Sequence, residues 1–292
     1  MWVITGASGQ LGRQIVESAL ARVSADQLGV SVRDVDQAQA LAERGVRVRR
    51  GDYDDPSALR HAFEGATQVV LVSSNGRVVG ADPLAQHRNV IEAAQAAGVR
   101  RILYTSHMAA SATSAFAPMH DHAATEAMLA QSGLAWTALR NGFYASSVLA
   151  MAADGFARGV LAFPEDGKVS WTAHRDLADA TAAILADEGR FDGPTPPLVA
   201  TEALDLADLA AVATEVLGRP VTRVVRSDDE FEAQLIARGV PAPRLAVMLG
   251  LFRASRRGEF ASADATLAQL LGRPPTSMRE LLRVPPGESQ SG

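Results

Sequence analysis

The 292-residue chain contains no cysteine. This absence excludes disulfides, a thiolate nucleophile, an iron–sulfur cluster and a cysteine-ligated zinc site. Lysine is almost absent as well, because Lys168 is the single lysine among 28 basic residues. No apolar run approaches the roughly 20 residues that cross a bilayer, and the net charge of −5 provides no general attraction for nucleic acid. We therefore expect neither a membrane nor a nucleic acid as a partner.

The remaining composition is that of a globular protein, with 47% hydrophobic and 21% charged residues. This is enough for one large core and a smaller appended lobe. The first residues, Met-Trp-Val-Ile-Thr-Gly, begin a strand at once and lack the basic and apolar regions of a signal peptide. We therefore expect a cytoplasmic location.

Short apolar runs alternate with amphipathic stretches through residue 140. The runs predict six strands, at residues 2–5, 28–33, 46–49, 68–73, 101–105 and 136–140. The stretches between them predict five helices, at residues 10–21, 35–44, 56–63, 83–97 and 123–131. Alternating strands and helices of this kind form a doubly wound parallel α/β sheet, the Rossmann fold.

The regular alternation of predicted strands and helices ends after residue 144. We expect helices at 146–157 and 176–187, a loop through Phe163-Pro164 and a strand at 168–172. The loop at 189–197 is rich in glycine and proline and marks a boundary. The later segments predict a strand at 221–226 and helices at 207–217, 227–238, 241–257 and 263–271, with a capping box at the start of the second of these. The sequence thus predicts a dinucleotide-binding domain over 1–198, with its core at 1–145, and a smaller, mostly helical lobe over 199–292, with an unstructured tail from about residue 284.

A glycine-rich turn joins the first predicted strand to the first predicted helix. It consists of Gly6, Ala7, Ser8, Gly9, Gln10, Leu11 and Gly12. Gly6 permits the tight turn, Gly9 permits close approach of a pyrophosphate, and Gly12 permits close packing of the helix. The helix start adds unpaired N–H groups and positive potential. The turn therefore predicts a dinucleotide site; the alternative is a glycine-rich turn that binds nothing.

The residue after the second strand distinguishes the two nicotinamide cofactors. An NAD-specific fold has an acidic residue here, whereas this chain has Arg33, which suits a 2′-phosphate. The alternative for Arg33 is that it is only a solvated charge at the end of a strand. Asp34 and Asp36 keep NAD open as a minor alternative cofactor. Asp52 and Tyr53, after the third strand, are candidates to bracket the adenine; alternatively, Asp52 only starts a turn.

Seven short motifs, each weak alone, occur in a fixed order. They are Thr5-Gly-Ala-Ser-Gly-Gln-Leu-Gly12, Ser31-Val-Arg33, Gly51-Asp-Tyr53, Gln86-His-Arg-Asn-Val90, Tyr104-Thr-Ser106, His122-Ala-Ala-Thr-Glu126 and Leu139-Arg-Asn-Gly-Phe-Tyr144. With them the chain resembles the NmrA-like atypical short-chain dehydrogenases, in the branch of NADPH:quinone oxidoreductase type 2 and triphenylmethane reductase. The resemblance extends to about residue 272.

This resemblance implies an NADP(H) cofactor. It implies that residues 6–12 and Arg33 hold the cofactor, that Ser73, Ser74 and Asn75 run past its pyrophosphate and ribose, and that Asn141, Gly142, Phe143 and Tyr144 lie by the nicotinamide. Arg175 matches a further position near the cofactor. These segments follow strand ends, which is where ligands bind in an open α/β sheet.

The chain departs from ordinary short-chain dehydrogenases at their Tyr-x-x-x-Lys dyad. Pro164, not tyrosine, stands four residues before Lys168, so alcohol–ketone chemistry with that acid is not expected. Two-electron reduction of a quinone or dye demands less, because the cofactor brings the hydride and the reduced oxygens take protons from water.

Four side chains are candidates for the chemistry. His122 and Tyr144 are candidate catalytic residues, and His107, Phe143 and Tyr144 are candidates to contact a planar substrate. His122 alternatively forms a helix-surface pair with Glu126, and the aromatic pair alternatively packs in the core. We expect Tyr104 in the core and no metal, because His120 and His122 cannot share one face of a helix.

The sequence therefore favours an NADPH-dependent oxidoreductase that reduces quinones or similar planar conjugated acceptors. The rival hypothesis is a non-catalytic redox sensor, since NmrA-like relatives include regulators that bind NADP(H) and contact a protein partner. A sugar-nucleotide epimerase or dehydratase is disfavoured because it needs the missing dyad. The physiological acceptor and homo-oligomerisation stay open.

Overall fold

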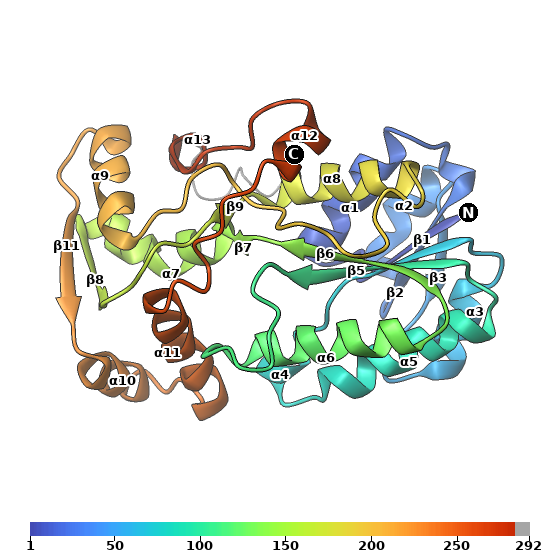
Figure 1. Ribbon diagram of the computed structural model, residues 1–292, viewed down its shortest axis with the longest axis horizontal. Coiled ribbons are helices and arrows are strands. Elements are labelled where there is room, and N and C mark those ends of the chain that lie inside the picture. Colours follow the sequence, from blue (N-terminus) through green and yellow to red (C-terminus); the bar gives the residue numbers. More distant parts are fainter. Residues whose placement is uncertain (284–292) are drawn as a thin grey trace.

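The structure is a computed structural model that describes residues 1–283, so the tail predicted from residue 284 lies outside the described residues. Its centre is a seven-stranded parallel sheet in the order β10-β6-β5-β4-β1-β2-β3 (Figure 1). The strands are β1 (Trp2–Thr5), β2 (Leu28–Val32), β3 (Arg47–Arg50), β4 (Gln68–Leu71), β5 (Arg101–His107), β6 (Ala135–Asn141) and β10 (Gly193–Pro194). The predicted doubly wound α/β class is confirmed.

Helices cover both faces of this sheet (Figure 1). One face carries α1 (Gln10–Leu20), α8 (His174–Ala186) and α12 (Thr266–Leu271), and the other carries α3 (Pro56–Phe63), α5 (Pro83–Ala96) and α6 (Pro118–Gln131). Neighbouring residues of β1 therefore enter different cores: Ile4 packs with Ile15 of α1, and Val3 packs with Leu59 of α3. Burial on both faces explains why the central strands read as continuous apolar runs.

The seventh strand corrects the prediction of six strands. β10 lies in the segment that we expected to be a loop, and it pairs with Thr137 and Ala138 of β6. Two residues, glycine and proline, carry no strand pattern, and proline is tolerated here because β10 is an edge strand.

The segment after β6 also differs from expectation. β7 (Phe143–Tyr144) pairs with β9 (Trp171–Thr172), and α7 (Ala145–Arg158) leads into β8 (Val160–Pro164), which pairs with β11 (Thr222–Arg226). The loop expected through Phe163-Pro164 is therefore wrong, because Pro164 ends a strand, a position that tolerates proline. The strand expected at 168–172 is shorter than predicted, since Val169 forms only an isolated bridge with Leu204.

The C-terminal helices are α9 (Leu206–Leu217), α10 (Asp228–Ala237), α11 (Ala242–Arg256) and α13 (Met278–Arg283). The capping box of Ser227 and Glu230 is confirmed at the start of α10. The sequence did not predict α13, which packs against α9. Short elements complete the described chain: η1 (Ala25–Gln27), η2 (Asp36–Ala38), α2 (Gln39–Glu43) and α4 (Gly76–Val79).

An apolar cluster joins the C-terminal part to the carboxyl edge of the sheet. It contains Phe116 and Met119 from the region of α6, Val148 from α7, and Leu249 and Phe252 from α11. The arrows of β5 and β6 point toward this junction (Figure 1). Residues that follow the central strands therefore lie where the sheet meets the C-terminal helices.

Candidate functional site

The glycine turn has the geometry that its spacing predicts. Gly6 adopts a φ of +59°, and the N–H of Gly9 donates to the Gly6 carbonyl at 2.9 Å. A Cβ on Gly12 would lie 2.3 Å from the same carbonyl oxygen, so Gly12 is needed for close packing. Among described residues other than its own chain neighbours, a Cβ built on Gly9 would have only that oxygen within 4 Å, at 3.2 Å. The Gly9 side of the turn is therefore open to a ligand.

Helix α1 begins directly after Gly9, and no described side chain caps its first turn. Its N–H groups and positive dipole end thus remain available for an anion. Ser8 is exposed, and its carbonyl accepts a hydrogen bond from Arg13 at 3.3 Å. The open turn and the uncapped helix together form a phosphate-binding geometry.

The candidate adenosine residues follow β2 and β3. Arg33 is exposed, and no salt bridge within residues 1–283 involves it. Asp34 accepts from the N–H of Asp36 and so shapes its own turn, at 3.1 Å. Asp52 likewise accepts from the N–H of Asp54 at 3.1 Å. The single cationic group among these side chains is thus left free for a ligand.

The Tyr53 hydroxyl forms two hydrogen bonds within the protein, which the sequence did not indicate. It donates to the Val72 carbonyl at 2.7 Å and bonds to Thr5 Oγ1 at 2.5 Å. Burial raises the pKa of the Tyr53 hydroxyl, while the Thr5 hydrogen bond and the Arg33 charge oppose that rise. The hydroxyl therefore ties the ends of β1 and β4 together, and only the ring of Tyr53 remains for contact with a base.

The segment after β4, residues 73–75, is held in place by hydrogen bonds from its backbone N–H groups to neighbouring side chains. The N–H of Ser73 donates to Thr105 Oγ1 at 2.8 Å, and the N–H of Ser74 donates to His87 Nε2 at 2.9 Å. His87 is therefore neutral, with its proton on Nδ1 toward Thr125, and burial lowers its pKa to about 3. The predictions did not include His87, although it lies in the Gln86–Val90 motif. Asn75 is exposed at the end of this segment.

Asn141 ends β6 and is fully buried. Neither its side-chain oxygen nor its side-chain nitrogen makes a hydrogen bond of ordinary geometry to another described residue, although the Tyr144 hydroxyl lies near enough for Asn141 to lower the pKa of that hydroxyl. Gly142 follows in tight packing, because a Cβ there would lie 2.2 Å from Thr172 Oγ1. A buried amide without partners costs free energy, so Asn141 is suited to a ligand that offers both a donor and an acceptor.

Phe143 and Tyr144 have different surroundings, although both are half-buried. The ring of Phe143 contacts His107, Phe116, Trp171 and Phe260 at centroid distances of 5.2 to 5.7 Å. The ring of Tyr144 lies 4.2 Å from that of His174, and burial raises the pKa of the Tyr144 hydroxyl to about 12. Phe143 thus belongs to an aromatic core, whereas Tyr144 lies between that core and α8.

His107 has a defined tautomer. Its Nδ1 accepts the N–H of Ala109 at 3.1 Å, so the ring proton resides on Nε2. That Nε2 is buried and has no partner in the described chain. Burial also lowers the pKa of His107 well below its usual value, so the ring stays neutral. His107 therefore presents one unused N–H donor at the end of β5.

His122 lies inside α6, which begins at Pro118 and not at residue 123 as expected. Its Nδ1 bonds to the Tyr104 hydroxyl at 2.8 Å, and burial lowers its pKa to about 4. Glu126 instead accepts from Ser106 at 2.6 Å and from Arg140 at 2.8 Å. The alternative of a surface His122–Glu126 pair is therefore wrong. Tyr104 is fully buried, as predicted.

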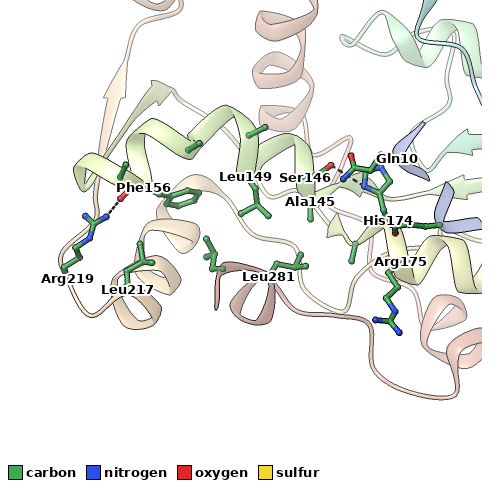
Figure 2. A pocket seen from close by; sticks show the side chains of 16 residues that line it. Gln10, Ala145, Ser146, Leu149, Phe156, His174, Arg175, Leu217, Arg219 and Leu281 are labelled. Carbon is green, nitrogen blue, oxygen red and sulfur yellow. Dashed lines mark hydrogen bonds between the residues drawn. The ribbon is translucent and has the colours of Figure 1, made fainter. Parts of the chain in front are cut away.

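A cavity of about 430 Å³ adjoins the phosphate turn (Figure 2). Its walls come from α1, α7, the start of α8, the end of α9 with the turn that follows it, and α13. They comprise Gln10, Gln14, Ala145, Ser146, Leu149, Ala150, Ala153, Phe156, Ala157, Ala173, His174, Arg175, Leu217, Arg219, Leu281 and Leu282. The sequence predicted only Gln10 and Arg175 of this set, because segments that lie far apart in the chain form the rest.

Two further structural findings concern ligands and location. No cluster of three or more His, Cys, Asp or Glu side chains in the described part of the chain is arranged to hold a metal ion. Among helices of residues 1–283, none combines the length and hydrophobicity required to cross a bilayer.

Comparison with known proteins identifies the family. Residues 6–188 match the family described as NAD(P)H-binding. The chain belongs to this family. It is 38% identical over 281 residues to quinone oxidoreductase 2 of Escherichia coli, covering 96% of each chain. It is also 30% identical over 288 residues to an NmrA-like family domain-containing oxidoreductase, flvB, of Aspergillus flavus, covering 97% of this chain and 94% of the relative.

Solved structures agree with the sequence comparison. The complex of the Escherichia coli quinone oxidoreductase with NADPH has a TM-score of 0.88 at 39% identity, covering 97% of this chain and 98% of that one. Triphenylmethane reductase from Citrobacter sp., complexed with NADP(H), has a TM-score of 0.88 at 30% identity, covering 97% and 99%. The predicted resemblance to NmrA-like reductases is thereby confirmed.

Proposed function

We propose that this protein is an NADPH-dependent oxidoreductase that transfers a hydride to quinones or similar planar conjugated acceptors. The observation that carries the proposal is the end-to-end similarity to a quinone oxidoreductase, at 38% identity over 96% of both chains. The open glycine turn supports it, because the turn offers the phosphate site that such a cofactor needs.

The residues of the site fit NADP(H). Residues 6–12 hold the pyrophosphate, and Arg33 pairs with the 2′-phosphate, for which an exposed arginine without a salt bridge is suited. Asp52 and Tyr53 flank the adenine, residues 73–75 line the ribose, and Arg175 lies near the cofactor. The partnerless amide of Asn141 binds the nicotinamide carboxamide, with residues 142–144 beside it. When bound, NADPH supplies the hydride.

The acceptor lies by Tyr144, with Phe143 and His107 behind it. The neutral His107 donates its Nε2–H to an acceptor oxygen, where negative charge develops on reduction. His122 positions this region through its bond to Tyr104. The division into residues 1–198 for the cofactor and 199–292 for the substrate side belongs to the same proposal.

The chemistry fits the absence of the Tyr-x-x-x-Lys dyad. The Lys168 ammonium bonds to Asp205 at 3.0 Å and also to Asp208, so it is engaged on the surface in an ion-pair cluster. Quinone reduction needs no such lysine, because the product oxygens take protons from water.

An absorbance assay of NADPH oxidation, across a panel of quinones and triphenylmethane dyes, tests the proposal. We expect at least one acceptor to accelerate NADPH oxidation, and Tyr144→Ala to lower that rate. Tight NADPH binding without acceleration by any acceptor would instead favour the non-catalytic NADP(H) sensor of the NmrA type.

A further inference from the structure

The cavity beside the phosphate turn extends well beyond the residues that a dinucleotide needs. It follows α7 from Ala145 to Ala157, a distance of about 18 Å at the rise of an α-helix. Leu217 forms its wall near the far end of α7, and Leu281 of α13 lies between the two ends (Figure 2). Its volume of about 430 Å³ is in the range of small-molecule sites. We call this feature the α7 groove.

The two ends of the α7 groove differ in polarity. Gln10, Gln14, Ser146 and His174 lie at the end near the turn, and the Gln14 Oε1 is buried without a partner among the described residues. Ser146 Oγ lies 3.3 Å from His174 Nδ1, and burial lowers the pKa of His174 to about 4. The polar end is therefore uncharged at neutral pH, apart from the exposed Arg175 at its mouth.

Apart from Arg219, the rest of the α7 groove is apolar. Leu149 and Phe156 of α7 lie opposite Leu281 of α13 (Figure 2). Ala153 and Leu282 also line the groove. Arg219 stands at the far end, where its guanidinium donates to the Phe156 carbonyl at 2.5 Å. Such walls suit a hydrocarbon chain and do not suit the phosphates of the cofactor.

The α7 groove begins next to Tyr144, where the acceptor ring is proposed to lie. Tyr144 immediately precedes α7, and its ring packs 4.2 Å from that of His174. His174 in turn lines the groove. A ring held beside Tyr144 can therefore extend a substituent past His174 and along α7.

We propose that the α7 groove binds the hydrocarbon side chain of the acceptor, so that the preferred substrates are quinones with a long apolar chain. This inference rests on the proposed function, because it takes the ring of the acceptor to lie at Tyr144. Burial of several methylene groups strengthens binding of the acceptor. We therefore expect a KM about tenfold or more lower for a quinone with such a chain than for a quinone without one.

Steady-state kinetics with duroquinone, which has no chain, and with decylubiquinone test the proposal. We expect a lower KM for decylubiquinone, and we expect Ala153→Trp, which fills the α7 groove, to remove most of that difference. Ser147→Trp is the matched control, because Ser147 is exposed on the same helix and does not line the groove. Equal KM values in the wild type, or a preference that survives Ala153→Trp, would overturn the proposal.

A labelling experiment gives a readout that does not depend on turnover. Because the chain has no cysteine, Ala153→Cys creates a single thiol in the α7 groove and Ser147→Cys a single thiol outside it. With NADP+ present, decylubiquinone should slow maleimide labelling of the first variant several-fold, and duroquinone should not. Both test quinones are fully substituted and so do not add thiols.

The two proposals fail in different ways. If no quinone is reduced but decylubiquinone still protects the thiol of Ala153→Cys, the proposed function fails and the groove stands as a chain-binding site. If duroquinone is reduced but decylubiquinone gives neither a lower KM nor protection, the enzyme stands and the groove proposal is overturned.

Discussion

Replacing Gly12 with alanine places a Cβ 2.3 Å from the Gly6 carbonyl oxygen, 2.8 Å from the Gly6 carbonyl carbon and 3.1 Å from the Ala7 Cα. All three are backbone atoms, so no side-chain rotation relieves the overlap. Alanine favours a helix over glycine by about 1 kcal/mol, whereas overpacking of this kind costs up to about 3 kcal/mol. We therefore expect Gly12→Ala to lower the free energy of unfolding by about 2 kcal/mol and to disturb the turn.

Gly9 provides the contrast within the same turn. Its φ of −79° and ψ of 166° are accessible to any residue, and its added Cβ meets only the Gly6 oxygen, at 3.2 Å. Gly9→Val should therefore change the free energy of unfolding by less than about 1 kcal/mol. Its side chain nevertheless occupies the open side of the turn, so we expect the Kd for NADPH to rise about tenfold or more.

Urea unfolding followed by circular dichroism, without cofactor, measures the first quantity, because bound ligand would add its own stabilisation. Titration of NADPH fluorescence measures the second. The reasoning is refuted if folded Gly9→Val binds NADPH as tightly as the wild type, or if Gly12→Ala is as stable as the wild type.

Three further predictions concern charge and protonation. Arg33→Ala should weaken the binding of NADPH about tenfold to hundredfold relative to that of NADH in fluorescence titrations. The control Arg226→Ala, at an exposed arginine, should leave both affinities unchanged. Equal losses of affinity for both cofactors in Arg33→Ala would count against a 2′-phosphate contact. His122→Ala should lower turnover about tenfold to hundredfold while the affinity for the cofactor is retained, because we propose that His122 positions the acceptor region and takes no part in acid–base chemistry. Unchanged turnover would show that His122 has no role in the site. The free energy of unfolding should fall as pH drops from 6.5 toward 4, since His122 and His174, with folded pKa values of about 4, take up protons mainly on unfolding. His122→Asn should reduce that slope by up to one proton, and an unchanged slope would contradict the burial argument.

The parts of the fold that the sequence predicted are those with local patterns. β1 and β4 are short apolar runs, and the turn at Gly6 joins strand to helix within a few residues. The edge strand β10 was not predicted because its two residues, a glycine and a proline, carry no strand pattern, and their pairing with β6 involves residues far away in the sequence. The early start of α6 had a local signal that was missed, namely Pro118 in the first turn.

The predicted site was limited in the same way. Arg33 was predicted from its place at a strand end, and Asn141 from the family resemblance. The lack of a hydrogen-bond partner for the Asn141 amide depends on everything packed around it, so the sequence could not indicate it. The bond of His122 to Tyr104 joins a helix to a strand 18 residues away, whereas the sequence offered Glu126 at a simpler helical spacing. The α7 groove combines five separate segments, so no single motif could indicate it.

The three tyrosines decide which reductions the chain can support. Burial raises the pKa of each hydroxyl; Tyr53 bonds to Val72 and Thr5, and Tyr104 bonds to His122. None in residues 1–283 is paired with the ammonium of Lys168, which bonds to aspartates instead. A hydroxyl with a raised pKa is a weak proton donor at neutral pH, so none of the three tyrosines is suited to the strong donation that reduction of an isolated ketone needs. A quinone spreads the incoming charge over its ring and can take its protons later from water. The reduction that we propose therefore needs no such acid, and it fits the proposed roles of Tyr144 as a flat contact and of His107 as a neutral N–H donor.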